Sequence, residues 1–292
     1  MTATLTRCRP ALGTYVKIAL RARDDGADRE TLIAHSDAAF AAIADVQRAM
    51  SAHDPDSELS RLTRTGHRAP VRVSSDLRTV LACALRLSAQ TDGAFDVTIG
   101  GAMVDRGLLP DVADGDARAD RRASWRDVVL EDDVVRLARP LRIDLGGIAK
   151  GYAVDRALAA VPPHVDAVVE AGGDLAMRPW RDQTIAVRVP GLIRRDRLIA
   201  LPMRAAAVAS SAGHWRGQPL AILCPQRRRA PRVRHGMTVF APSCMLADAL
   251  TKAAFLAPER VPWRRLEATA LRVDRRGRVA VVGPADPDGA AP

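Results

Sequence analysis

The spacing of hydrophobic and polar positions changes several times along the chain, and each change predicts a different element. Within residues 30–50, apolar side chains recur every three or four positions, which is typical of an amphipathic helix. A second helix is predicted over residues 76–90, with Asp76 near its start and Gly93 just after its end. Residues 14–20 alternate apolar and polar side chains instead, and therefore predict a half-buried strand.

The second half of the chain is dominated by strand patterns. Two short apolar runs around Asp132–Asp133 predict a β-hairpin, and residues 266–283 predict another whose turn lies near Gly277. Further strand-like runs cover residues 165–178, 184–190, 198–203, 219–225 and 236–240. Because helical and strand patterns are mixed without regular alternation, the sequence predicts an α+β fold.

The ends of these patterns suggest the domain organisation. A last helix is predicted to begin near Ala247, and the last strand pattern ends at about residue 283. We therefore expect a single domain over residues 1–283 and a disordered, Pro/Gly-rich tail over residues 284–292. No internal repeat is visible, so the patterns give no support to a solenoid or a propeller.

Composition narrows the chemistry of the core and of the ligand. Hydrophobic residues make up 48% of the chain but aromatic residues only 3%, so the core must consist mainly of Leu, Val, Ile and Ala. The formal net charge of +10 invites a nucleic-acid-binding interpretation. The basic residues are scattered, however, and no aromatic side chains stand among the densest runs to stack on bases. The charge therefore favours a phosphate-bearing small ligand over nucleic acid.

Cysteines and apolar runs bear on the compartment. The four cysteines form no Cys-x-x-Cys pair, which favours a reduced, cytoplasmic setting. The N-terminal residues show no signal-peptide pattern, and no apolar run approaches the roughly 20 residues of a membrane helix. We expect a cytoplasmic protein without membrane insertion.

One lysine stands out in a chain that uses arginine almost throughout. Of 44 lysines and arginines only three are lysines, and Lys150 lies in the stretch RIDLGGIAKGYAVDRAL (142–158). This stretch predicts a strand end, a glycine turn and a helix start, and such a helix N-terminus binds phosphate oxygens well. A lysine ammonium adds a compact positive charge. An ordinary strand–turn–helix with a solvated lysine explains the pattern equally well.

Two further glycine-containing segments carry candidate carboxylates. Asp174 follows the glycine pair of AGGDLAMR (171–178), where it could accept a hydrogen bond from a ligand hydroxyl, although a plain β-turn or bulge is as good an explanation. In residues 91–101, Asp96 and Thr98 are expected on one side of an extended segment. A carboxylate buried there needs a donor, which either a cofactor or a backbone N–H could provide.

The last candidate lies at the start of the C-terminal helix. Asp248 and Lys252 stand one helical turn apart in SCMLADALTK (243–252), a spacing that predicts a salt bridge. Alternatively, Asp248 could be one ligand of a hard cation that also binds phosphate and water.

Taken together, these segments resemble one family. They are LGTYVKI (12–18), MSAHDPDSELSRL (50–62), TDGAFDVTIG (91–100), IDLGGIAKGYAVD (143–155), AGGDL (171–175), AVASSAGHW (207–215) and PSCMLADALTK (242–252). In order and content they resemble the ApbE family of FAD:protein FMN transferases, over about residues 12–256. The resemblance implies an α+β fold of two intimate lobes with an FAD cleft between them.

The resemblance also implies a reaction and a set of site residues. FMN passes from FAD to a Thr or Ser hydroxyl of an acceptor flavoprotein, AMP is released, and Mg²⁺ is required. Lys150 and Asp248 are implied as catalytic residues. The positions that match FAD contacts are Leu12, His53, Ala94, Phe95, Asp96, Asp144 and Lys150. The positions that match metal ligands are Gly147 and Thr251, through their main-chain carbonyls, and Asp248.

Three positions depart from the family pattern. Lys252 stands where the family commonly has a threonine, four residues after the metal aspartate, and His53 stands in place of a tyrosine. Ala221 occupies the position of a histidine often assigned as the general base, and His214 and His235 are its nearest substitutes in sequence. Besides an active transferase, the sequence is therefore compatible with a catalytically degenerate FAD carrier or an FAD pyrophosphatase.

Overall fold

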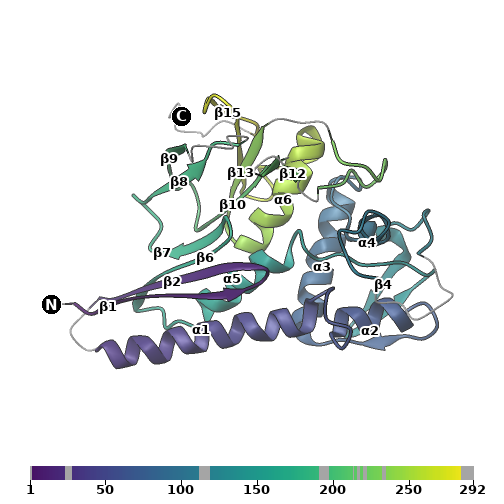
Figure 1. Cartoon of the computed structure of the whole chain (residues 1–292), viewed down its shortest axis with the longest axis horizontal. Coiled ribbons are helices and arrows are strands. Elements are labelled where there is room, and N and C mark those ends of the chain that lie inside the picture. Colours follow the sequence, from purple (N-terminus) through teal and green to yellow (C-terminus); the bar gives the residue numbers. More distant parts are fainter. Residues whose placement is uncertain are drawn as a thin grey trace.

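The computed structural model describes residues 2–23, 28–111, 119–190, 197–212, 214–215, 218–219, 222–231 and 235–283 (Figure 1), with only the backbone considered at 214–215 and 218–219. Within these residues, helices and strands are mixed, as an α+β fold requires. No helix in this part of the chain is long and apolar enough to cross a membrane.

An eight-stranded antiparallel sheet forms the larger part of the molecule. Its order is β1-β2-β6-β7-β10-β13-β14-β15. The strands are β1 (Thr4–Ala11), β2 (Thr14–Ala22), β6 (Val165–Ala171), β7 (Asp174–Arg178), β10 (Ala207–Ala212), β13 (Gly236–Ala241), β14 (Thr269–Val273) and β15 (Val279–Val281). Because β2 pairs with β6, the N-terminal hairpin joins the strands of the second half in one sheet.

Three helices cover this sheet. Helix α1 (Arg29–Met50) runs along β1 and β2, α5 (Ala149–Ala159) packs on β6 and β7, and α6 (Cys244–Leu256) packs on β10 and β13 (Figure 1). The apolar stripe of α1 is buried as its periodicity predicts, with Leu32 and Ile43 almost inaccessible. Helix α5 lies between α1 and α6 and contacts both of them.

A smaller group of elements lies beside the sheet, on the right of Figure 1. It contains α2 (Glu58–Thr65), α3 (Ser75–Gln90), α4 (Gly100–Val104) and a three-stranded sheet of β3 (Val71–Arg72), β5 (Val134–Leu137) and β4 (Val128–Glu131). One apolar core passes through both groups and joins Leu81 of α3 to Val169 of β6 and Leu250 of α6. The remaining strands form two ribbons, β8 (Thr184–Arg188) with β9 (Leu198–Pro202) and β11 (His214–Trp215) with β12 (Gln218–Pro219).

Most of the predicted elements are present. The helices predicted over residues 30–50 and 76–90 are α1 and α3, the strand over 14–20 is β2, and both predicted hairpins form. The hairpin turns use the expected residues, with Asp132 and Gly277 at positive φ. The tail at 284–292 lies outside the described residues, and its disorder stays a prediction.

Four local predictions were wrong. The last helix begins at Cys244 because Ser243 accepts a hydrogen bond from the Leu246 N–H and caps it early. Of the described residues in the strand expected over 219–225, Pro219 ends the short strand β12, residues 222–223 are irregular and Cys224 forms only an isolated bridge to Arg229.

The other two errors concern the segments around Asp96 and Asp144. Val97–Ile99 is a 3₁₀ helix, η1, rather than an extended segment, because Asp96 caps it. The expected strand end at 142–145 is irregular, since its partner is this short helix and not a strand: the Asp144 N–H donates to the Val97 carbonyl at 2.7 Å.

Helices α5 and α6 approach each other unusually closely at Gly151. A Cβ atom at this position would lie 2.2 Å from the Cys244 carbonyl oxygen and 2.8 Å from the Cβ of Asp248, so only glycine fits. The Gly151 N–H also donates to Asp248 Oδ2 at 3.1 Å. The crossing therefore fixes the position of the first turn of α5 relative to Asp248.

We expect Gly151→Ala to destabilise the fold by about 3 kcal/mol or more, because overpacking against backbone forces the two helices apart. Gly236→Ala is the matched control, since the nearest atom to its Cβ would be the Ser211 carbonyl oxygen at an ordinary 3.4 Å. Urea unfolding of both variants measures the difference. Equal, small losses in both would contradict the steric role assigned to Gly151.

Candidate functional site

A compact group of charged side chains lies where α5, α6 and β7 meet. Lys150, in the first turn of α5, forms an ion pair with Asp174 at the start of β7. Its Nζ is also 4.0 Å from Asp248 Oδ2 in α6. The two carboxylates are almost inaccessible to solvent, so each needs a positive charge nearby. Elements far apart in the sequence thus build one charged cluster.

Every oxygen atom of Asp248 is engaged by the protein itself. Its Oδ1 forms an ion pair with Lys252, and its Oδ2 accepts from the Gly151 N–H. The main-chain oxygen accepts from Lys252 Nζ at 3.0 Å and from Thr251 Oγ1 at 2.7 Å. The Thr251 hydroxyl is also 2.8 Å from Ser211 Oγ of β10. Asp248 is therefore held by two ammonium groups and one backbone donor.

The electrostatics of the cluster favour the ion-paired state. Burial raises the pKa of Asp248, but the charges of Lys150 and Lys252 outweigh this effect and bring the pKa below its ordinary value. Burial lowers the pKa of Lys150, and the Asp248 carboxylate opposes that shift. Each charge thus stabilises the other, and a lone member of the cluster would be unfavourable at this depth.

The turn before α5 carries a third carboxylate toward the same place. Asp144 Oδ1 accepts a hydrogen bond from the Gly146 N–H at 2.8 Å, which closes a tight turn. Burial raises the pKa of Asp144, while the charges of Lys252 and His53 lower it. A Cβ on Gly147 would lie 3.3 Å from Cε of Lys252, so the lysine stem lies directly against this turn.

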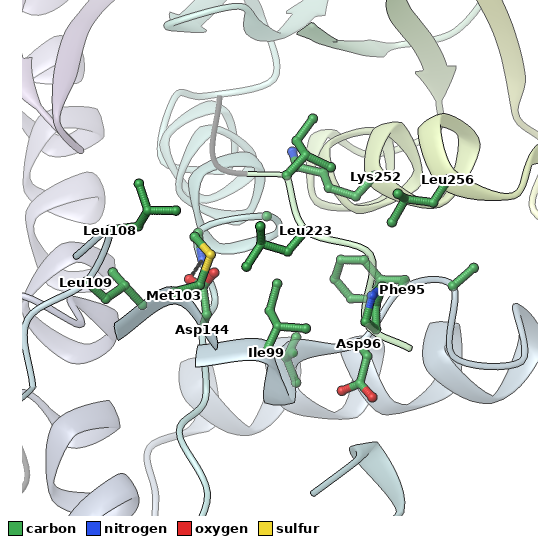
Figure 2. A pocket seen from close by; sticks show the side chains of 16 residues that line it. Phe95, Asp96, Ile99, Met103, Leu108, Leu109, Asp144, Leu223, Lys252 and Leu256 are labelled. Atoms are coloured by element: carbon green, nitrogen blue, oxygen red, sulfur yellow. Dashed lines mark hydrogen bonds between the residues drawn. The ribbon is translucent and has the colours of Figure 1, made fainter. Parts of the chain in front are cut away.

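A cavity of about 250 Å³ opens beside the cluster. Figure 2 shows Lys252 reaching into it from α6, with Asp144 and the apolar side chains of Phe95, Met103 and Leu223 around it. Its lining is Ala94, Phe95, Asp96, Val97, Ile99, Met103, Leu108, Leu109, Asp144, Gly146, Gly147, Ile222, Leu223, Pro225, Lys252 and Leu256. The cavity therefore joins an apolar wall, suited to a planar ring, to a charged wall. Its volume is below the roughly 300–1,000 Å³ of typical ligand sites, so it would hold only part of a dinucleotide.

Most of the predicted site residues meet at this cavity. Ala94, Phe95, Asp96, Asp144 and Gly147 line it, and Lys150 and Asp248 lie in the charged cluster beside it. Thr251 lies behind Asp248, fully buried, with its hydroxyl turned to Ser211.

Asp96 has all its hydrogen bonds satisfied within the protein. Its Oδ1 accepts from the N–H and hydroxyl of Thr98 at 2.8 and 2.7 Å, and its Oδ2 accepts from the Trp125 N–H at 3.1 Å. Burial raises the pKa of Asp96, whereas these bonds lower it. The carboxylate thus shapes the loop that forms the cavity wall, and a contact with a ligand stays a prediction.

Leu12 and His53 do not line the cavity. Leu12 lies in the β1–β2 turn at a positive φ of 55°, where its N–H donates to Gln47 Oε1 at 2.7 Å. His53 follows α1 in the chain and acts on Asp144 through its charge. Both lie near a second cavity of about 440 Å³ between β1 and α1, which Ser51 and Asp54 help to line.

The histidines considered as substitutes for a general base are only partly described. His235 precedes β13 and packs its ring on Phe255 of α6, with ring centroids 5.1 Å apart. Burial lowers its pKa. Ala221 and the side chain of His214 lie outside the described residues, so the identity of a base stays open.

Sequence reasoning missed a positioning residue in the cluster. Asp155, in the middle of α5, accepts hydrogen bonds from the N–H groups of Cys244 and Met245 at 2.7 and 2.8 Å. It thereby caps α6 from outside and ties the two helices together. The only available signal was its place at the end of the segment IDLGGIAKGYAVD (143–155).

Comparison with known proteins identifies one family over most of the chain. A family model described as the ApbE family matches residues 12–272. The FAD:protein FMN transferase of Haemophilus influenzae is 29% identical to this chain, over 81% of this chain and 76% of its own length. That of Vibrio cholerae is 28% identical, over 90% of this chain and 84% of its own length. The solved flavin transferase ApbE of Vibrio cholerae has a TM-score of 0.79 at 25% identity, covering 96% of this chain and 97% of its own. The Thermotoga maritima ApbE protein has a TM-score of 0.78 at 24% identity, with 96% and 97% covered.

The capping role of Asp155 gives a stability prediction that depends on pH. Burial raises its pKa from 3.8 to about 6, so the folded state binds this proton more tightly than the unfolded state. The contribution to stability is therefore complete below about pH 4 and is lost as the pH rises through 6, by up to about 3 kcal/mol. We expect the free energy of unfolding of Asp155→Asn, measured in urea, to lack this decline.

Asp45→Asn serves as the control, because Asp45 lies exposed on α1. It should keep the decline between pH 4 and 6 that the unmodified protein shows. If the stability difference between Asp155→Asn and the unmodified protein is the same at pH 4 and pH 7, the raised pKa of Asp155 is wrong.

Proposed function

The chain belongs to the ApbE family, and from this membership we propose that it transfers FMN from FAD to a Thr or Ser hydroxyl of an acceptor protein, with release of AMP. The observation that carries the proposal is the meeting of Lys150 and the Asp248 helix beside one cavity. A diphosphate placed there would face ammonium groups, and a ring attached to it would face the apolar wall.

The proposed reaction replaces the phosphoanhydride bond of FAD with a phosphoester bond to the acceptor. The acceptor hydroxyl oxygen forms a bond to the phosphorus of the FMN half, and the bond from that phosphorus to the bridging oxygen breaks. The bridging oxygen leaves with AMP and keeps the bonding electron pair, while the hydroxyl proton passes to a base or to solvent. Phosphoryl transfer of this kind depends mostly on positioning and on neutralising the charge that develops.

The residues of the chain supply both requirements in this proposal. Lys150 offers a positive charge to the diphosphate, and the N-terminal end of α5, whose cap residue Ile148 makes no side-chain hydrogen bond, adds the positive end of a helix dipole. The Gly146–Gly147 turn brings backbone close to the cavity without side chains in the way. Phe95 and Leu223 exclude water from the ring side.

The magnesium ion implied by the family does not fit the donor set as it stands. Of the predicted ligands, Gly147 and Thr251 would bind through main-chain carbonyl oxygens, and Asp248 is the one charged ligand. The Asp248 carboxylate is already paired with Lys252 and lies 4.0 Å from Lys150 Nζ. Among the described residues, no group of three or more His, Cys, Asp or Glu side chains could hold a metal. A divalent ion 4 Å from an ammonium would be repelled by about 8 kcal/mol at an effective dielectric constant of 20.

A carrier that holds FAD without turnover, or a pyrophosphatase that uses water as the acceptor, is the alternative function. Ala221 motivates both, because the chain lacks a histidine at the position that the family uses as a base. The cytoplasmic location and the absence of nucleic-acid binding expected from the sequence also stay predictions.

Quantifying AMP, free FMN and covalent flavin after incubation with FAD and a bacterial protein extract separates these functions. A transferase releases AMP in proportion to flavin bound to protein, detected by fluorescence in a denaturing gel. A pyrophosphatase releases equal AMP and FMN with no covalent flavin, and a carrier releases neither. Either of the last two outcomes would refute the transferase proposal.

We further expect Lys150→Met to weaken FAD binding and AMP release by about 10- to 100-fold, the usual loss when one charged hydrogen bond is removed. Lys17→Met is the matched control, because Lys17 is half-exposed on β2 and pairs only with Glu170 among the described residues. A Lys150→Met protein that binds and turns over FAD normally would show that the diphosphate lies elsewhere.

A further inference from the structure

Lys252 binds Asp248, the carboxylate that the family resemblance assigns to a metal ion. Its ammonium contacts two oxygens of that residue, Oδ1 of the carboxylate and the main-chain oxygen one turn back in α6. An ammonium has three N–H groups, so two are taken by Asp248 and one is left for a ligand. Lys252 is also one of the residues that line the cavity (Figure 2).

The lysine stem is held as well as its head. A Cβ atom built on Gly147 would lie 3.3–3.6 Å from Cε, Cδ and Cγ of Lys252. The stem of the lysine therefore packs along the glycine turn. The side chain is only 20% exposed. The fully buried carboxylate of Asp248 thus holds the ammonium of Lys252, and the glycine turn holds its stem. An ordinary i, i+4 salt bridge differs because it lies on a solvated helix face.

Lys150 and Lys252 bring two ammonium groups to the site, and the diphosphate bridge of FAD carries two negative charges. The four charges of the cluster sum to zero, so a diphosphate would bind through N–H donors that the carboxylates leave available. Asp174 and Asp248 pair with these ammonium groups. The protein thus holds two ammonium groups in position close to Asp248, and Lys252 also lines the cavity.

We propose that Lys252 is the resident cation of this site, so that the protein binds and cleaves FAD without a divalent metal ion. This inference rests on the proposed function. It assigns to Lys252 the task of binding a phosphate oxygen and neutralising the charge that builds up as AMP departs. Asp248 is then a positioning residue for two ammonium groups and is not a metal ligand.

The first test needs no flavin and therefore does not depend on the proposed function. Calorimetric titration of magnesium chloride into the purified protein should show no binding up to millimolar concentration, whereas Lys252→Thr, which removes the ammonium and adds a hydroxyl oxygen beside Asp248, should bind magnesium. Saturable binding to the unmodified protein that Asp248→Asn abolishes would overturn the inference. Lack of binding by Lys252→Thr would count against the idea that the ammonium is what excludes the metal.

The second test compares FAD affinity in EDTA and in millimolar magnesium, by flavin fluorescence. We expect less than a twofold difference for the unmodified protein. In EDTA, Lys252→Met should bind FAD at least tenfold more weakly, because the stem is kept and the charge is lost. Lys17→Met should behave like the unmodified protein. A tenfold loss of FAD affinity in EDTA for the unmodified protein, restored by magnesium, would refute a metal-independent site.

Folding and function are separated by these comparisons. Circular dichroism and urea unfolding show whether Lys252→Met and Lys252→Thr are folded. Lys252→Arg, which retains the positive charge, is the further variant to test if either of them does not fold. If Lys252→Arg binds FAD in EDTA no better than Lys252→Met, the charge is not what matters and the inference fails. If the unmodified protein binds no FAD under any condition, the proposed function fails, while the magnesium titration still decides whether Lys252 excludes the metal.

Discussion

The close crossing of α5 and α6 is the constraint on which the site depends. At Gly151 the backbone of α5 lies directly against Cys244 and Asp248 of α6. The Gly151 N–H donates to the Asp248 carboxylate, which Lys150 and Lys252 also approach. Asp155 strengthens the crossing from the other side by capping α6. If the helices were separated by the width of one methyl group, Asp248 would lose its backbone donor and the cluster its geometry.

The buried charges are stable because none of them is alone. Removing a carboxylate or ammonium from water costs several kcal/mol, and only an opposite charge in good geometry offsets this cost. Lys150, Lys252, Asp174 and Asp248 meet that condition together. Such a cluster contributes little net stability, but it keeps two ammonium groups beside a cavity, where an anion can make new contacts with them. The arrangement thus accounts for lysine at two positions in a chain otherwise rich in arginine.

The two groups of elements provide the two walls of the cavity. Helix α6 provides Lys252 and Leu256, and the turn before α5 provides Asp144 and Gly147. The segment after α3 provides Phe95, α4 provides Met103, and Asp96 holds its loop in shape through hydrogen bonds from Thr98 and Trp125. A ligand with an anionic part and a planar apolar part would therefore contact both groups at once, and this agrees with a flavin dinucleotide as the substrate.

The sequence alone determined the fold class, the long helices, the hairpins and the family, because these follow from periodicity, turn residues and the order of short motifs. It also predicted Lys150 and Asp248 in one site, and the structure brings Lys150 Nζ to 4.0 Å from Asp248 Oδ2, while their catalytic roles stay predictions. It misplaced the start of α6, where the local cap Ser243 is reinforced by Asp155, 89 positions away from Cys244, whose carboxylate accepts from the first N–H groups of the helix. It could not show how Lys252 is bound. A spacing of four residues predicts only a salt bridge, whereas the contact of its stem with Gly147 and the burial of Asp248 exist only once α5 and α6 have packed together.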